Sequence, residues 1–115
     1  MYLAEVCFET NDVVGLSNFY RKLLQLEEEN MDEVHQCIIG DQVGITVYND
    51  GSVKNNHNNN ITLAFTVEDV DAEYKRLLEM DIKIIEPPTT RLWGARNMHF
   101  CDPDGNHIYF RSFPK

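Results

Sequence analysis

The residues best suited to chemistry are two histidines near the C-terminal end of the chain, His99 and His107. Each alternates with bulky apolar residues, and successive side chains of a strand point to opposite faces of a sheet. In a β-hairpin the two histidines would therefore share one face with Cys101 and Tyr109. If Glu5 reached the same face, two imidazoles and a carboxylate could form a facial triad of metal ligands. The simpler interpretation is that each histidine is hydrogen-bonded or solvated on the sheet face.

The three cysteines, Cys7, Cys37 and Cys101, are widely spaced and form no C-x-x-C motif. This odd number and this spacing favour reduced, buried thiols over a disulfide framework or a zinc knuckle. The sequence also contains no G-x-S-x-G, G-x-G-x-x-G or P-loop motif. A nucleophile elbow, a dinucleotide-binding fold and a phosphate cradle therefore have no support.

The composition indicates one small acidic domain. The chain has 115 residues, with 10 basic and 19 acidic side chains and a formal net charge of −9 at pH 7. An excess of acid argues against a nucleic-acid partner, because such proteins gather Lys and Arg on one face. No segment approaches the roughly 20 apolar residues of a membrane span, and the N-terminus has no secretory signal pattern. We expect a cytoplasmic protein that binds neither nucleic acid nor membrane.

The chain contains an internal repeat, because segments 5–24 and 62–78 match each other. The elements of this repeat must position the candidate residues. Each begins with an alternating strand. In the first, Val6 and Phe8 point one way while Glu5, Cys7 and Glu9 point the other. Each strand runs into an aspartate suited to cap a helix, and apolar residues at helical spacing follow.

The remaining pattern of each half predicts further strands and tight turns. Strands are expected at 28–32, 34–39 and 43–48 after the first helix, and at 82–85, 97–101 and 106–110 after the second. Pro87-Pro88 is expected to break the chain between two of these strands. The whole chain, residues 1–115, is therefore predicted to be one domain of two βαβββ repeats. The first covers about 1–50 and the second about 60–113, with an Asn-rich linker over 51–59.

Several of these motifs resemble the glyoxalase/bleomycin resistance/extradiol dioxygenase superfamily, also called vicinal oxygen chelate proteins. The resemblance rests on the alternating strand followed by Asp12 and Phe19-Tyr20-Arg21, on its repeat, and on the turn over 102–106, Asp-Pro-Asp-Gly-Asn. Trp93-Gly94-x-Arg96 before that turn is most similar to the bleomycin-resistance branch. The resemblance implies an α+β fold in which two βαβββ repeats form a curved mixed sheet with the helices on its convex side. It also implies a homodimer, and leaves open whether the repeats pair within one chain or across the dimer.

Metal-dependent members of the superfamily bind Zn, Ni, Fe or Mn through the first and fourth strands of each half. The matching positions here are Glu5, Thr62, Tyr109 and either Ile45 or Thr46. Only Glu5 is a good ligand for such ions. No cofactor is therefore predicted, and Glu5, His99 and His107 form the alternative metal set.

We interpret the protein as a metal-free small-molecule binder that sequesters a cationic or aromatic compound. Trp93 and Tyr109 offer stacking and cation–π surfaces, and the net charge favours a cation. The predicted ligand-binding residues are Glu5, Glu9, Thr46, Tyr48, Thr62, Trp93, Arg96, His107, Tyr109 and Arg111.

Two alternatives remain open. One is an enzyme, either a lyase or isomerase resembling glyoxalase I (lactoylglutathione lyase) or a dioxygenase, using a divalent metal as Lewis acid or Glu5 as general base. The other is a degenerate copy that acts only as a dimerising or regulatory module. Elemental analysis of the purified protein separates the first from the binding interpretation.

Overall fold

The computed structural model describes residues 3–39, 43–51 and 61–114. The chain divides into two compact units, Met1–Asn56 and His57–Lys115. Within the described residues, each unit contains one helix and one mixed sheet, which confirms the α+β class and the two repeat-like halves. The linker predicted at 51–59 lies outside the described residues except for Gly51.

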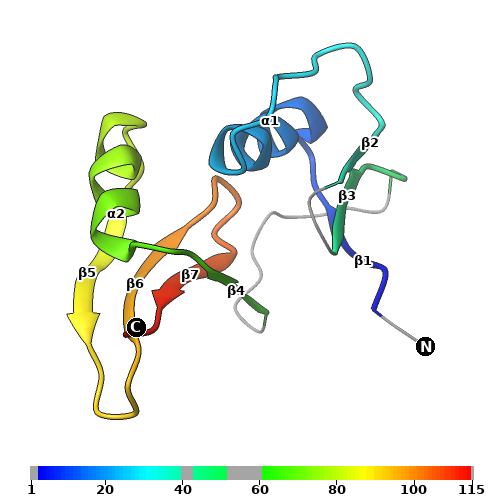
Figure 1. Cartoon of the computed structure of the whole chain (residues 1–115). Helices are drawn as coiled ribbons and strands as arrows, with labels where there is room; N and C mark the ends of the chain where they lie inside the picture. The colour runs from blue at the N-terminus through cyan, green and yellow to red at the C-terminus, as the bar shows by residue number, and fades with distance from the viewer. Residues whose placement is uncertain (1–2, 40–42, 52–60, 115) are drawn as a thin grey trace. The chain divides into compact units, whose positions relative to one another are not determined.

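The first unit consists of β1 (Glu5–Glu9), α1 (Val13–Leu23), β2 (His35–Ile38) and β3 (Gly44–Tyr48). Its strand order is β1-β3-β2, with β1 parallel and β2 antiparallel to β3 (Figure 1). The Asp12 carboxylate caps α1 by accepting a 2.9 Å hydrogen bond from the backbone N–H of Gly15. Behind this cap, Leu16 and Tyr20 are buried, and the Tyr20 ring stacks on Phe8 of β1 at a centroid distance of 5.6 Å. The apolar face of the predicted helix thus packs on the apolar face of β1 in one core.

The strand predicted at 28–32 is wrong, so the described residues of the first unit form βαββ, without the fourth strand expected of it. Side chains satisfy the backbone of this segment in place of a neighbouring strand. The side-chain amide oxygen of Asn18 accepts from the N–H of Glu29 at 2.9 Å, and the Asp32 carboxylate accepts from the N–H groups of Val34 and His35 at 2.9 Å each. Short polar side chains that bond nearby backbone groups compete with sheet formation.

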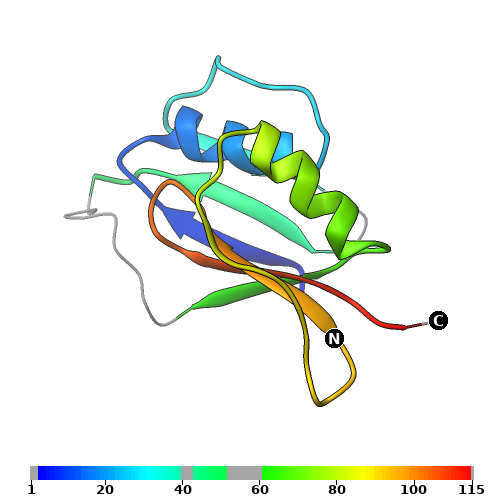
Figure 2. The same cartoon turned by 90° about the vertical axis from the view of Figure 1, so that its left-hand side faces the viewer.

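The second unit consists of β4 (Thr62–Thr66), α2 (Val70–Glu79), β5 (Ile84–Thr90), β6 (Arg96–Cys101) and β7 (His107–Ser112). The strand order is β4-β7-β6-β5, and only the β4–β7 pair is parallel. Figure 2 shows this unit from green β4 to red β7. Asp69 caps α2 as Asp12 caps α1, by accepting from the N–H groups of Asp71 and Ala72. This unit is βαβββ, as predicted.

Pro87-Pro88 does not interrupt the strand pattern as expected, because β5 continues through both prolines. The ladder between β5 and β6 instead shifts register on either side of Glu86. β5 lies at the edge of its sheet, where a residue without an N–H costs no ladder bond on the outer side. The position of β5 at the sheet edge, rather than the local sequence, therefore decides whether the two prolines interrupt the strand.

The turn between β6 and β7 fixes the hairpin that carries both histidines. Asp102 is only 5% exposed, and its carboxylate accepts from the N–H of Asp104, the N–H of Asn106 and the Asn106 side-chain amide at 2.7–2.9 Å. Gly105 has a φ of 86°, a conformation that favours glycine. The resulting register opposes His99 to Tyr109 and Cys101 to His107. The alternate positions of the hairpin are fully or almost fully buried beside α2: Met98, Phe100, Ile108 and Phe110.

Candidate functional site

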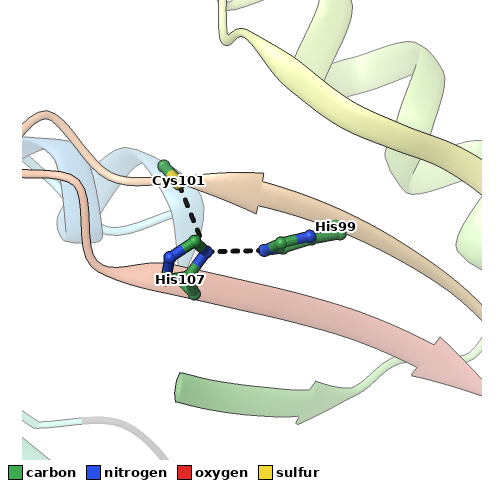
Figure 3. Close-up of side chains that lie close together, drawn as sticks. All are labelled: His99, Cys101 and His107. Carbon is green, nitrogen blue, oxygen red and sulfur yellow. Dashed lines mark hydrogen bonds between the residues drawn. The ribbon is translucent and has the colours of Figure 1, made fainter. Parts of the chain in front are cut away.

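The polar face of the β6–β7 hairpin brings together three side chains with metal-ligating atoms. The Nε2 atom of His99 lies 2.8 Å from Nδ1 of His107, and the Cys101 sulfur lies 3.7 Å from the same Nδ1 atom (Figure 3). All three ligating atoms fall within 4.8 Å of one another, and the three residues are half-buried. The prediction that His99, Cys101, His107 and Tyr109 share one hairpin face is confirmed by the register.

Tyr109 holds the ring of His99 in place. The two rings are stacked, with centroids 4.3 Å apart and planes inclined by 6°. Burial, together with the nearby His107, lowers the pKa of His99. Burial, with the neighbouring Asp102 as a second cause, raises the pKa of the Cys101 thiol. Both shifts favour the uncharged form of the side chain, a neutral imidazole at His99 and a protonated thiol at Cys101.

The rest of this face extends along β7 and β4. Thr62 pairs with His107 in the parallel ladder, so the two predicted ligand-binding residues are neighbours. Arg111 donates from Nε to the Thr66 hydroxyl at 3.2 Å, and its guanidinium carbon lies 5.6 Å from the centre of the Phe113 ring. The strands therefore place Thr62, His107, Tyr109 and Arg111 on one polar and aromatic surface.

Trp93 lies before β6 and is 61% exposed. Its ring contacts Phe113 edge to face at a centroid distance of 6.4 Å. Phe113, which also carries the Arg111 contact, therefore links Trp93 to the end of β7.

Arg96 does not lie on the face of His107 and Tyr109. It lies on the same face of β6 as Met98 and Phe100, and its guanidinium forms a bidentate ion pair with Asp71 of α2 at 2.8 and 2.9 Å. The structure thus separates Arg96 from the other predicted ligand-binding residues of this unit. The pair holds the pKa of Asp71 below its ordinary value.

In the first unit, the face away from α1 carries a second group of predicted residues. The Thr46 hydroxyl donates to the Glu5 carboxylate at 2.7 Å, and the Cys7 thiol donates to the same carboxylate at 3.4 Å. These hydrogen bonds lower the pKa of Glu5. A carboxylate with a lowered pKa is a weaker proton acceptor, which disfavours Glu5 as a general base.

Glu9 and Tyr48 form a separate pair on the same face. The Tyr48 hydroxyl donates to Glu9 at 2.8 Å, which raises the pKa of Tyr48 to about 12. Their positions are opposed in the β1–β3 ladder, so the bond follows from the register. Two of the predicted ligand-binding residues therefore already partner each other.

The expectation that the cysteines are buried is wrong. Cys7 and Cys37 are exposed and Cys101 is half-buried, although all three are free thiols. The Cys37 sulfur lies 3.6 Å from the Thr46 hydroxyl. Each cysteine occupies the strand position that faces away from its helix, so none enters the apolar core.

A hollow of about 540 Å³ lies on the other side of the second unit, near the start of α2. Its lining is mainly acidic: Glu68, Asp69, Ala72, Glu73 and Ser112. None of the residues predicted to bind a ligand or metal belongs to it.

The positions that match the family's metal ligands do not form a suitable donor set. Ile45 is buried on the α1 side, and Thr46 already donates to Glu5. Thr62 and Tyr109 contribute only neutral hydroxyl groups, which bind transition metals poorly. These residues therefore do not fit the metal that the resemblance implies.

The sequence predicted that Cys101 lies on the same hairpin face as the two histidines, but Cys101 was not among the predicted metal ligands. Its sequence signal was the alternation His99-x-Cys101 before the turn. The cross-strand pairing with His107 turns that alternation into a three-residue cluster.

A protein-family model matches residues 3–110 of the chain. The matching model is described as the Glyoxalase/Bleomycin resistance protein/Dioxygenase superfamily. Among curated proteins, the uncharacterized protein YraH of Bacillus subtilis (strain 168) is 49% identical over 47 residues. That match spans 40% of this chain and 37% of the length of YraH.

Solved structures with the same fold cover nearly the whole chain. A glyoxalase/bleomycin resistance protein/dioxygenase from Nocardioides has a TM-score of 0.79 and 18% identity, with 100% of this chain and 85% of that chain covered. A lactoylglutathione lyase from Agrobacterium tumefaciens has a TM-score of 0.74 and 18% identity, with 96% and 92% covered. A chain described as a conserved domain protein reaches a TM-score of 0.82 at 22% identity, with 99% and 100% covered. At these identities the likeness establishes the fold alone.

Proposed function

Because the chain belongs to the glyoxalase/bleomycin resistance protein/dioxygenase superfamily, we propose that it binds a small organic molecule on the polar faces of its sheets. The observation that carries the proposal is the mixed surface of the second unit. There the stacked His99–Tyr109 pair lies beside His107 and Arg111, while the opposite face is packed with apolar side chains. Sites for small organic molecules combine aromatic area with a few placed polar groups.

A planar aromatic or cationic compound suits this surface best. Tyr109 offers a ring face for stacking, and the exposed Trp93 offers the side chain best suited to a cation–π contact. The net charge of −9 adds a long-range attraction for cations. Sequestration of such a compound needs affinity but no chemical step.

The test is a thermal-shift screen of cationic and aromatic compounds, followed by calorimetric titration of those that raise the melting temperature. Trp93 is the single tryptophan of the chain, so its fluorescence reports binding near the end of β7. We expect Tyr109→Leu to weaken binding about fivefold or more through loss of the stacking surface, which is worth about 1 kcal/mol or more.

Tyr74→Leu is the matched control, because Tyr74 lies on α2 in the same unit. It should leave the affinity unchanged. A ligand whose affinity is insensitive to Tyr109→Leu, or equally sensitive to Tyr74→Leu, would show that this face is not the binding surface.

The metal-dependent lyase, isomerase or dioxygenase is the second candidate function. The fold it shares with the lactoylglutathione lyase supports it. The donor set at the positions that match the family's ligands does not, since Glu5 is the one strong ligand among them. We therefore favour binding over catalysis.

The proposal also includes a homodimer in the cytoplasm. Within residues 3–39, 43–51 and 61–114, no helix is long and apolar enough to cross a membrane. Light scattering coupled to size-exclusion chromatography measures the mass directly. A mass of one chain across the micromolar range would reject the dimer.

A further inference from the structure

The His99, Cys101 and His107 side chains form a cluster that the family's ligand positions do not include. We propose that this cluster binds a divalent transition-metal ion of the zinc type. The ligands would be Nε2 of His99, Nδ1 of His107 and the thiolate of Cys101. This site goes beyond the proposed function, because an ion can bind here whether or not an organic ligand is found.

Two of the three separations between ligand atoms can be compared with those of a tetrahedral site, and the third, from His99 Nε2 to Cys101 Sγ, is within 4.8 Å. With zinc–nitrogen bonds of about 2.0–2.1 Å and a zinc–sulfur bond of about 2.3 Å, tetrahedral angles separate two nitrogens by roughly 3.3 Å and a nitrogen from a sulfur by roughly 3.6 Å. The observed separation of Cys101 Sγ from His107 Nδ1 is 3.7 Å. The two ring nitrogens are 2.8 Å apart, so they need to separate by about half an ångström. Small side-chain rotations supply that change.

The hairpin also holds the ligands rigidly. Cys101 and His107 are directly opposed in the ladder, and His99 is stacked on Tyr109. The buried Asp102 anchors the turn that joins the two strands through three hydrogen bonds. A site built on two paired strands loses less entropy on binding an ion than one built on loops.

The chemistry of the donors selects the ion. Two imidazoles and a thiolate suit zinc, cobalt, nickel or copper, whereas magnesium, calcium and manganese prefer oxygen ligands. Three protein ligands leave a fourth position for water or another molecule, the arrangement found in zinc sites with an open position. The half-buried side chains of this face leave that position reachable from solvent.

The test uses the full chain, treated with a chelator, desalted and kept reduced, with Co²⁺ alone as the probe. We expect a sulfur-to-cobalt charge-transfer band and the visible bands of tetrahedral cobalt, saturating at one ion per chain. Zn²⁺ should then remove these bands and raise the melting temperature. Absence of the charge-transfer band at saturating Co²⁺ would overturn the proposal.

Variants identify the ligands. Cys101→Ser should abolish the charge-transfer band. His99→Gln and His107→Gln should each weaken Co²⁺ binding at least about 100-fold, because losing only a hydrogen-bond partner of a metal ligand already costs about 10- to 100-fold. Cys7→Ser and Cys37→Ser are the matched controls, since both are exposed thiols of the first unit. They should leave the spectrum and the affinity unchanged. A band that survives Cys101→Ser, or disappears in either control, would refute the site.

A measurement without substitutions covers the case in which a variant fails to fold. In spectra of the histidine-labelled wild-type chain, Zn²⁺ should shift the ring resonances of His99 and His107 and leave those of His35 and His57 in place. Shifts confined to the latter pair, or no shift at all, would contradict the proposal. Because the probes are metal ions alone, these outcomes are independent of the search for an organic ligand.

Discussion

At the scale of single residues, cross-strand hydrogen bonds set the ionisation of the polar faces. Glu5 has a lowered pKa because Thr46 and Cys7 donate hydrogen bonds to it, and Tyr48 has a raised pKa because its hydroxyl donates a hydrogen bond to Glu9. The hydrogen bonds from Thr46 to Glu5 and from Tyr48 to Glu9 join residues far apart in the sequence that a ladder brings together. The same mechanism joins His107 to Cys101 and His99.

Glu9→Gln should lower the pKa of Tyr48 from about 12 towards its ordinary value. The Glu9 carboxylate stabilises the protonated Tyr48 phenol. This hydrogen bond therefore contributes fully to the stability of the fold below pH 10, the pKa of Tyr48 in the unfolded chain. The contribution is lost as the pH rises through about 12, the pKa of Tyr48 in the folded protein. A titration of the Tyr48 ring resonance in the labelled protein measures the midpoint. Glu27→Gln, in the exposed segment after α1, is the control and should not move it. Equal midpoints in wild type and Glu9→Gln would contradict the assignment.

At the scale of elements, capping and turn residues decide where each helix and strand begins. Asp12 and Asp69 occupy equivalent positions and cap α1 and α2 in the same way. The β6–β7 turn depends on Asp102, which is buried and accepts three hydrogen bonds. The Arg96–Asp71 pair, in turn, ties β6 to α2 on the side away from the histidines.

Asp102→Ala should lower the free energy of unfolding by about 2–3 kcal/mol, because it leaves buried donors of Asn106 without an acceptor. Chemical denaturation monitored by circular dichroism measures the loss. Glu79→Ala, exposed near the end of α2, should change stability by no more than about 0.5 kcal/mol. If the two variants are equally stable, Asp102 does not anchor the turn.

At the scale of the whole molecule, the relevant property is the net charge of −9. Acidic side chains face solvent on both units, including Glu9 beside Tyr48 and the residues lining the hollow near α2. Such a charge attracts cations from solution, and dissolved salt screens that attraction. The charge of a ligand should therefore determine how strongly its binding affinity depends on salt concentration.

A cationic ligand should lose about fivefold in affinity, or about 1 kcal/mol, between low and high salt, since the Debye length falls from about 30 Å at 0.01 M to about 3 Å at 1 M. A neutral aromatic ligand of similar shape should keep its affinity. Calorimetric titration at both salt concentrations makes the comparison. A cationic ligand with salt-independent affinity would exclude a role for the net charge in recognition.

The sequence by itself determined the repeat, the class of fold and the two faces of the β6–β7 hairpin, because alternation, helix caps and turn residues act over a few neighbouring positions. It also placed His99, Cys101, His107 and Tyr109 together on one face.

Only the tertiary structure decided matters that depend on partners elsewhere in the chain. It turned the segment at 28–32 into a loop, carried β5 through two prolines at a sheet edge, and left Cys7 and Cys37 exposed and Cys101 half-buried. It paired Arg96 with Asp71 of the helix, away from the other candidate residues. Cross-strand register and ion pairing join residues that are distant in sequence, and no local pattern encodes them.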